Sequence, residues 1–217
     1  MAVTTASGFM GFPREAFAFF ASLERNNNVD WFRAHKDTYE SACRAPMKAL
    51  IEELVPGRPV RMSRINRDMR FARDGNPYKT HLSAGVAGNY LSLMSQGLYV
   101  GTGIYRPEPP LLAKLRAAID DERAGSELVA IIKTLRKQRY DVDTHESVAS
   151  APKGYRPDHP RIELLRMKDM FAGKTFAPSA TLSSHKAVEQ IRKVMDDLTP
   201  LRKWLSAHVP HGHGVEA

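Results

Sequence analysis

The stretch KTHLSAGVAGNYLSLMSQGLYVGTGIYR, residues 79–106, decides the fold. Here the hydrophobic pattern changes from a helical period to alternation, and turn residues at Gly88 and Gly97 divide the stretch. An antiparallel meander is therefore expected, with strands at 79–86, 89–95 and 98–106. In its last strand Gly101 and Gly103 lie on one face, which indicates the close approach of another backbone or of a ligand.

Helical periodicity precedes and follows this meander. An apolar face of Phe17, Phe20 and Leu23 indicates a helix that begins after Pro13. A second helix is expected to open at Asp30, because three asparagines precede it and asparagine caps helices well. Pro46 is expected to mark either a fresh helical start or a kink. Further helical segments are expected at 109–122, at 126–137 and at 183–208, the last kinked or split at Pro200.

The order helix, sheet, helix predicts an α+β fold. We expect an antiparallel sheet of about four strands, flanked by N-terminal helices and covered by C-terminal helices. The fourth strand would be 60–65, which has mixed faces, whereas 140–161 is rich in proline and glycine and reads as a loop. One domain is expected over 9–207, with flexible tails at 1–8 and 208–217.

Composition narrows the class of protein. With 42% hydrophobic and 26% charged residues, the chain has an ordinary globular balance rather than that of a disordered one. It has no apolar run near the roughly 20 residues that span a bilayer, and no secretory signal pattern. The single cysteine, Cys43, suits a reducing compartment, so a cytoplasmic location without membrane attachment is expected. The formal charge of +8 favours anionic partners, although many proteins are simply basic.

The most unusual local feature is an arginine at every third position from residue 58 to residue 73. Steps of three cannot share one face of an α-helix, and on a strand they alternate sides. The guanidinium groups must nevertheless be paired, solvated or neutralised by a ligand. Three interpretations stay open: structural salt bridges, binding of a small anion, and contact with nucleic acid.

Residues 67–81 combine donors, acceptors and an imidazole in a segment with turn character, as functional loops often do. The candidate acid or base residues are His81, Asp68 and His35. The candidate ligand-binding residues are Lys36, Arg67, Arg70, Asp74, Tyr78, Lys79, Lys153 and His159. In this hypothesis the arginines and Lys79 hold a phosphate or carboxylate, Asp68 pairs with one of the two histidines, and Lys153 and His159 close the pocket. The alternative is that these polar residues form structural contacts only.

Several motifs occur together in one order: NNNxxWFxxHKxxY at 26–39, RDxRFxxD at 67–74, PYKTH at 77–81, GxGxY at 101–105 and PKGY at 152–155 followed by Asp158-His159-Pro160. Over residues 11–205 the chain resembles the bacterial and fungal family catalogued as domain of unknown function 2461. The resemblance implies that the polar motifs recur as a set. It transfers no catalytic residue, because no activity is established for the family. Residues 141–151 depart from the family pattern, which argues against a strand there.

Familiar catalytic and cofactor motifs are absent from the sequence. There is no HExxH, paired cysteine, EF-hand, GxxxxGK[ST], strand-to-helix GxGxxG or GxSxG pattern. His208, His211 and His213 near the C-terminus could capture a metal but have no carboxylate to orient them, so neither a metal site nor a cofactor is predicted. Three functions remain: a pocket for a small anion, with or without enzymatic activity; a nucleic-acid-binding module; and an interaction protein with structural salt-bridge networks.

Overall fold

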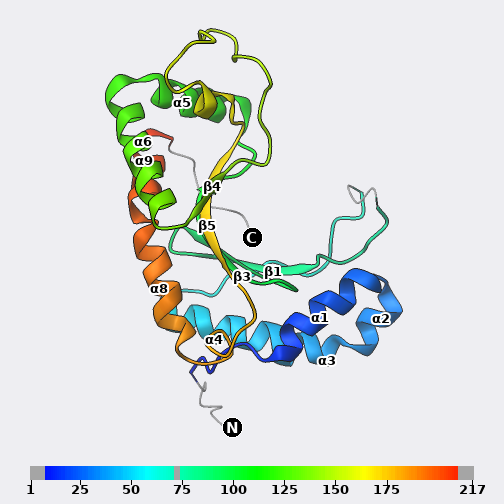
Figure 1. The fold of residues 1–217 in the computed structure, drawn as a ribbon. Coiled ribbons are helices and arrows are strands. Elements are labelled where there is room, and N and C mark those ends of the chain that lie inside the picture. Colours follow the sequence, from blue (N-terminus) through cyan, green and yellow to red (C-terminus); the bar gives the residue numbers. More distant parts are fainter. Residues whose placement is uncertain (1–7, 71–73, 210–217) are drawn as a thin grey trace. The chain divides into compact units, whose positions relative to one another are not determined.

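The computed structural model describes residues 8–70 and 74–209 (Figure 1). Its helices before the sheet are α1 Arg14–Arg25, α2 Val29–Ala34, α3 Lys36–Thr38, the π-helical turn η1 Tyr39–Arg44 and α4 Ala45–Leu54. The later helices are α5 Pro109–Asp120, α6 Glu122–Lys137, α7 Ile162–Arg166, α8 Ala187–Asp197 and α9 Thr199–His208. The strands are β1 His81–Val86, β2 Asn89–Met94, β3 Gly97–Ile104, β4 Asp141–Asp143 and β5 Met170–Phe176.

The predicted α+β fold is confirmed. The strands form one antiparallel sheet in the order β1-β2-β3-β5-β4, so the sheet has five strands rather than about four. Of the described residues, those up to Val100 together with Thr175–Lys193 make one compact unit, and Gly101–Lys174 together with those from Val194 to Val209 make a second. The single domain expected over 9–207 remains a prediction. Within the described residues, no helix is long and apolar enough to cross a membrane.

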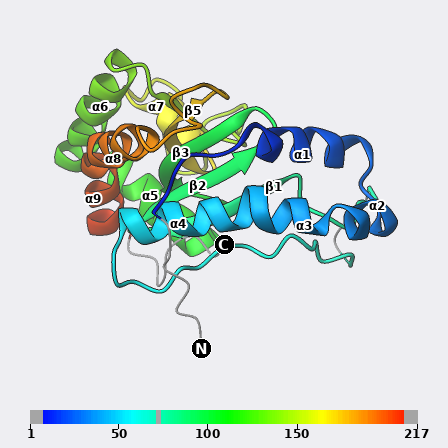
Figure 2. The same ribbon diagram turned by 90° about the horizontal axis from the view of Figure 1, so that it is seen from below.

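In the first unit, the N-terminal helices pack beside the β1–β2 hairpin (Figure 2). Helix α1 begins after Pro13, as expected, and buries the face that contains Phe17, Phe20 and Leu23. At the start of α2 the side chain of Asn28 accepts a hydrogen bond from the backbone N–H of Trp31 at 2.9 Å. The asparagine run therefore ends one helix and caps the next, as its composition predicts.

The helix expected from Asp30 is interrupted. Its backbone leaves helical geometry at His35, and residues Tyr39–Arg44 form a π-helical turn before α4 begins with Pro46 in its first turn. The interruption has a local cause, because the His35 ring stacks on Trp31 and its Nδ1 bonds the Trp31 carbonyl. The backbone stays helical from this turn through Arg44 into α4, so the change of helix type lies just before Pro46 and no fresh start occurs there.

The prediction of a strand at 60–65 is wrong. Around this segment the described residues form isolated β-bridges only. One joins Met62 to Ala84 of β1, and the other joins Asn66 to Tyr78, which precedes β1. Between the two bridges lie three residues, 63–65, on one side and five, 79–83, on the other. Unequal spacing prevents a regular ladder, so the segment follows β1 without becoming a strand.

In the second unit, helices α5, α6 and α9 pack together. The buried Trp204 of α9 donates from Nε1 to the carbonyl of Ala124 in α6 at 2.9 Å, which ties the two helices by more than apolar contact. The long helix expected at 183–208 is split at Leu198 into α8 and α9, with Pro200 in the first turn of α9. The predicted break at this proline is confirmed.

Strands β4 and β5 are the elements that sequence reasoning missed. They pair with Asp141 opposite Gly173 and Asp143 opposite Phe171, inside and just after the region expected to be loop. β4 is only three residues long, and a single apolar residue between two aspartates carries almost no strand pattern. The departure of 141–151 from the family pattern was also a poor guide to this strand.

Gly103 on β3 provides a test of the close approach predicted from its glycines. A Cβ atom there would collide with the carbonyl oxygen of Met170 and lie 2.6 Å from Cα of Phe171. We expect Gly103→Ala to lower the free energy of unfolding by about 1–3 kcal/mol in urea denaturation. Gly8→Ala is the control, because a Cβ there meets only Glu53 Oε2, at 3.8 Å. Equal denaturation midpoints for the two variants would contradict the close approach.

Candidate functional site

In the first unit, the arginines of the 67–81 loop are paired with nearby carboxylates. Arg67 Nη1 donates to both carboxylate oxygens of Asp74, at 2.7 and 2.9 Å. Arg70 donates to Asp68 through Nε at 3.0 Å and Nη2 at 2.6 Å. These bonds lower the pKa of Asp74 to about 2 and also lower the pKa of Asp68. The pairing supports the structural interpretation for Arg67 and Arg70; Arg73 lies outside the described residues.

Tyr78 and the asparagine motif lock this loop to the helices. The Asn27 side chain accepts from the backbone N–H of Tyr78 at 3.0 Å and donates to its carbonyl at 2.9 Å. The buried Tyr78 ring stacks on Phe32 with 4.1 Å between centroids. Tyr78 is therefore a packing residue. The Asn27 side chain satisfies both the N–H and the carbonyl of the Tyr78 backbone, as a neighbouring β-strand would.

The predicted acid or base residues of the first unit have separate surroundings. His35 donates from Nδ1 to the carbonyl of Trp31 at 2.8 Å and stacks on the Trp31 ring, while Lys36 is exposed at the start of α3. Among the described residues, no hydrogen bond joins Asp68 to His35 or His81. The proposed carboxylate–histidine pair is thus not formed here, and the three residues stay predictions as catalytic groups.

Lys79 is coupled electrostatically to Arg64 and to His81. Burial lowers the pKa of Lys79, and the charge of Arg64 lowers it further. Burial likewise lowers the pKa of His81, with a second contribution from Lys79. Within the described residues, Lys79 has no carboxylate at ion-pair distance. Arg64 also interacts with the carboxylate of Asp68, so Lys79 is the cation of this group for which the described residues show no ion pair.

Two of the predicted residues, Lys153 and His159, belong to the second unit. His159 Nδ1 accepts from the backbone N–H of Arg161 at 3.0 Å, so the ring proton is on Nε2, which lies 3.2 Å from Asp120 Oδ1. Both ring nitrogens are therefore engaged, and the side chain is only 16% exposed. His159 is better placed to hold α5 and the following loop than to exchange protons with a ligand.

Lys153 lies at a cavity of about 300 Å³ within the second unit. Its described lining comprises Pro107, Pro109, Leu112, Ala113, Arg116, Lys153 and Tyr155. Two cations and a phenol thus face an apolar floor, and no carboxylate occurs among these lining residues. Arg116 is held in place because its Nε donates to the carbonyl of Leu165 at 3.0 Å. Burial raises the pKa of Tyr155, as does Asp120 to a smaller extent, so its hydroxyl keeps its proton.

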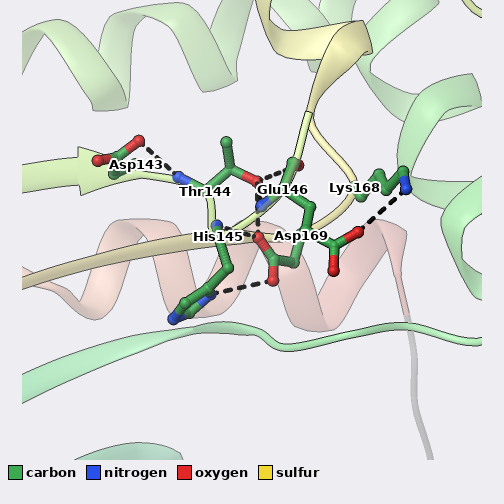
Figure 3. A network of polar contacts seen from close by, with 6 residues as sticks. All are labelled: Asp143, Thr144, His145, Glu146, Lys168 and Asp169. Atoms are coloured by element: carbon green, nitrogen blue, oxygen red, sulfur yellow. Dashed lines mark hydrogen bonds and ion pairs between the residues drawn. The ribbon is translucent and has the colours of Figure 1, made fainter. Parts of the chain in front are cut away.

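A second polar constellation of this unit was missed by sequence reasoning. Asp169, at the start of β5, accepts hydrogen bonds from Thr144 Oγ1 at 2.6 Å, from the backbone N–H of His145 at 2.7 Å and from His145 Nδ1 at 3.0 Å. In Figure 3 the carboxylate lies between the Thr144 hydroxyl and the His145 ring. Burial raises the pKa of Asp169, but these hydrogen bonds lower it by more, and the net pKa is below the ordinary value.

No local sequence pattern predicts the pairing of His145 with Asp169. His145 and Asp169 are 24 residues apart, and each sits among unremarkable neighbours. Only the pairing of β4 with β5 brings them together. The described residues contain no group of three side chains suited to hold a metal ion, and His211 and His213 lie outside them.

Comparison with known proteins adds a family but no activity. The family model described as "Conserved hypothetical protein (DUF2461)" matches residues 15–204, which confirms the resemblance drawn from the motifs. No curated protein and no solved structure shows significant similarity to the chain.

Asp169→Asn tests whether the buried carboxylate is ionised. Because its folded pKa is depressed, its contribution to stability is complete above the unfolded value of about 4 and is lost as the pH falls through the folded value. In urea denaturation we expect the variant to be about 2 kcal/mol less stable than wild type at neutral pH. The difference should shrink below a pH of about 4.

Asp158→Asn is the matched control for this measurement. Asp158 also has a lowered pKa, caused by its bond to Arg156, but that ion pair lies in solvent. We expect little change in stability at any pH for this variant. A deficit for Asp169→Asn that stays constant into strong acid would show that the carboxylate is not the charged group we describe.

Proposed function

The chain belongs to the DUF2461 family of conserved hypothetical proteins, and from this premise we propose that it binds a small anionic ligand in the cavity of the second unit. The observation that supports the proposal is that Arg116 and Lys153 both line one cavity, and that the described lining of this cavity carries no carboxylate. Lys153 comes from the PKGY motif, one of the motifs on which the family resemblance rests.

Arg116 is suited to recognise a carboxylate or phosphate. Its bond to the Leu165 carbonyl uses the Nε–H and fixes the plane of the guanidinium. The terminal Nη groups then offer two donors side by side, an arrangement that matches two oxygens of an anion. Lys153 contributes a mobile charge on an exposed side chain, and Tyr155 contributes a hydroxyl donor.

The cavity floor favours a ligand that also has an apolar part. Pro107, Pro109, Leu112 and Ala113 supply hydrocarbon surface around the two cations. A volume of about 300 Å³ is at the lower end for small-molecule sites and excludes large cofactors. A small aromatic or aliphatic carboxylate, or a phosphate monoester of similar size, fits these dimensions and this chemistry.

A nucleic-acid-binding module is the second candidate, and a specific observation favours it. Arg58, Arg61 and Arg64 have exposed side chains, and no ion pair engages them within the described part of the chain. Exposed arginines without counter-charges attract phosphate backbones, with an affinity that falls steeply as salt rises. This candidate uses the first unit, so the two functions can be separated by mutation.

Binding is tested by calorimetric titration with benzoate, phenyl phosphate, inorganic phosphate and a short single-stranded oligonucleotide. We expect saturable binding of benzoate or phenyl phosphate at one molecule per chain, weakened about tenfold or more in Lys153→Gln. Lys133→Gln, which removes an exposed charge on α6, should bind as wild type does.

The outcomes separate the candidates. Oligonucleotide binding that is lost in Arg61→Gln and insensitive to Lys153→Gln would favour the nucleic-acid module. Equal affinities of Lys153→Gln and Lys133→Gln for every small anion would refute the cavity as the binding site.

A further inference from the structure

We propose that His145 is an acid–base catalytic residue and that Asp169 is the positioning residue that orients it. The pair would act on the small anionic molecule held in the neighbouring cavity, and in this respect the inference rests on the proposed function. Neither residue has an assigned role, and neither belongs to a motif of the family resemblance.

The bond between the two residues determines which ring nitrogen is free. An ionised carboxylate only accepts hydrogen bonds, so the proton in the 3.0 Å contact belongs to His145 Nδ1. In the neutral ring, Nε2 therefore carries a lone pair and no proton. A general base needs this arrangement, with one nitrogen anchored by a carboxylate and the other open to accept a proton.

The two side chains of the pair differ in their exposure to solvent: Asp169 is buried and His145 is half-exposed. The side chain of Asp169 is 2% exposed, whereas that of His145 is 51% exposed. A carboxylate buried to this extent must be fully hydrogen-bonded to stay ionised, and its three bonds to Thr144 and His145 achieve this. The inner charge can then stabilise a positive charge that forms on the outer ring when it takes a proton.

A structural role alone would not require the ring. The Thr144 hydroxyl and the backbone N–H of His145 already hold the turn against Asp169. The imidazole adds a bond that directs Nε2 away from the carboxylate, and two aromatic rings border it. Its centroid lies 4.5 Å from that of Phe171 and 5.0 Å from that of Tyr105.

These contacts join the imidazole to the segment that leads into the anion cavity. The Tyr105 side chain is 56% exposed and its ring meets the His145 ring edge to face, while Pro107, two residues later, lines the cavity. The Cα atoms of Tyr105 and Pro107, two residues apart, lie at most about 7 Å from each other. The inference requires a ligand that extends from the cavity past Tyr105 and brings a hydroxyl or a bound water to Nε2.

The other paired histidines lack this combination. His159 has both ring nitrogens engaged. His185 also bonds a carboxylate, with 2.6 Å between Nε2 and Glu53 Oε1, but no aromatic ring contacts it among the described residues. His185 belongs to the first unit and is therefore a matched control: a half-exposed histidine with a carboxylate partner outside the site.

The test uses p-nitrophenyl acetate, a neutral ester whose hydrolysis reports an exposed imidazole lone pair. The Nε2 lone pair bonds to the acyl carbon, the bond to the phenolic oxygen breaks, and p-nitrophenolate leaves with the electron pair. Water then hydrolyses the acyl-imidazolium to acetate, which restores the neutral ring with its proton on Nδ1 and releases two protons to the solvent. The release of p-nitrophenolate is followed at alkaline pH for wild type and for His145→Gln, Asp169→Asn and His185→Gln, with folding checked by circular dichroism.

We expect His145→Gln to lower the rate of wild type by clearly more than His185→Gln does, because the nitrogen that His185 leaves free is Nδ1, which is crowded by the neighbouring Cβ. Asp169→Asn, if folded, should lower the rate about tenfold, since it removes the group that fixes the reactive tautomer. A merely structural Asp169 would leave the rate of the folded variant intact. If Asp169→Asn does not fold, the hydrolysis rate of His145→Gln, compared with that of His185→Gln, tests the inference by itself.

The inference is overturned if His145→Gln hydrolyses the ester as fast as wild type, or if the two histidine variants lose the same fraction of the rate. Because the ester carries no anionic group, this result does not depend on anion binding in the cavity. Failure of the titrations with benzoate and phenyl phosphate would instead remove the proposed ligand class and leave the reactivity of His145 standing.

Discussion

The carboxylate of Asp169 is almost completely shielded from water, and a charge in that position has to be matched by hydrogen-bond donors. The donors come from Thr144 and His145, which follow β4, whereas Asp169 stands at the entry to β5. One ionised group thus joins the ends of two paired strands. The bond to Asp169 sets the direction of the His145 ring, and the pairing of β4 with β5 places Phe171 beside it.

The four cations that bear on the two candidate sites differ in their partners among the described residues. Arg67 and Arg70 bond carboxylates only a few residues away, so their charge is used within the loop that carries them. Arg116 bonds a backbone carbonyl, and Lys153 meets no carboxylate in the described lining of the cavity. An anionic ligand is attracted by a cation that has no carboxylate partner within the protein. The number of arginines in a stretch of sequence does not show which of them lack such a partner.

Elements set by local pattern could be predicted from the sequence, and those set by distant contacts could not. The meander and α1 follow from alternation, helical period and turn residues that lie within a few positions of one another. β4 is too short to show any period, and its existence depends on β5. For the site, Lys153 was recognisable because its motif is local. Arg116, His145 and Asp169 acquire their roles from partners 24 to 49 residues away, which no spacing rule reveals.

The claim on which the account depends is that Asp169 holds the proton of His145 on Nδ1. It is measured most directly by the ring ¹⁵N chemical shifts of His145 in two-dimensional NMR spectra at alkaline pH, assigned by comparison with His145→Gln. The account predicts a protonated Nδ1 and an unprotonated Nε2, the less common tautomer of a free neutral imidazole. A proton on Nε2 in the wild-type protein, with Nδ1 bare, would contradict it.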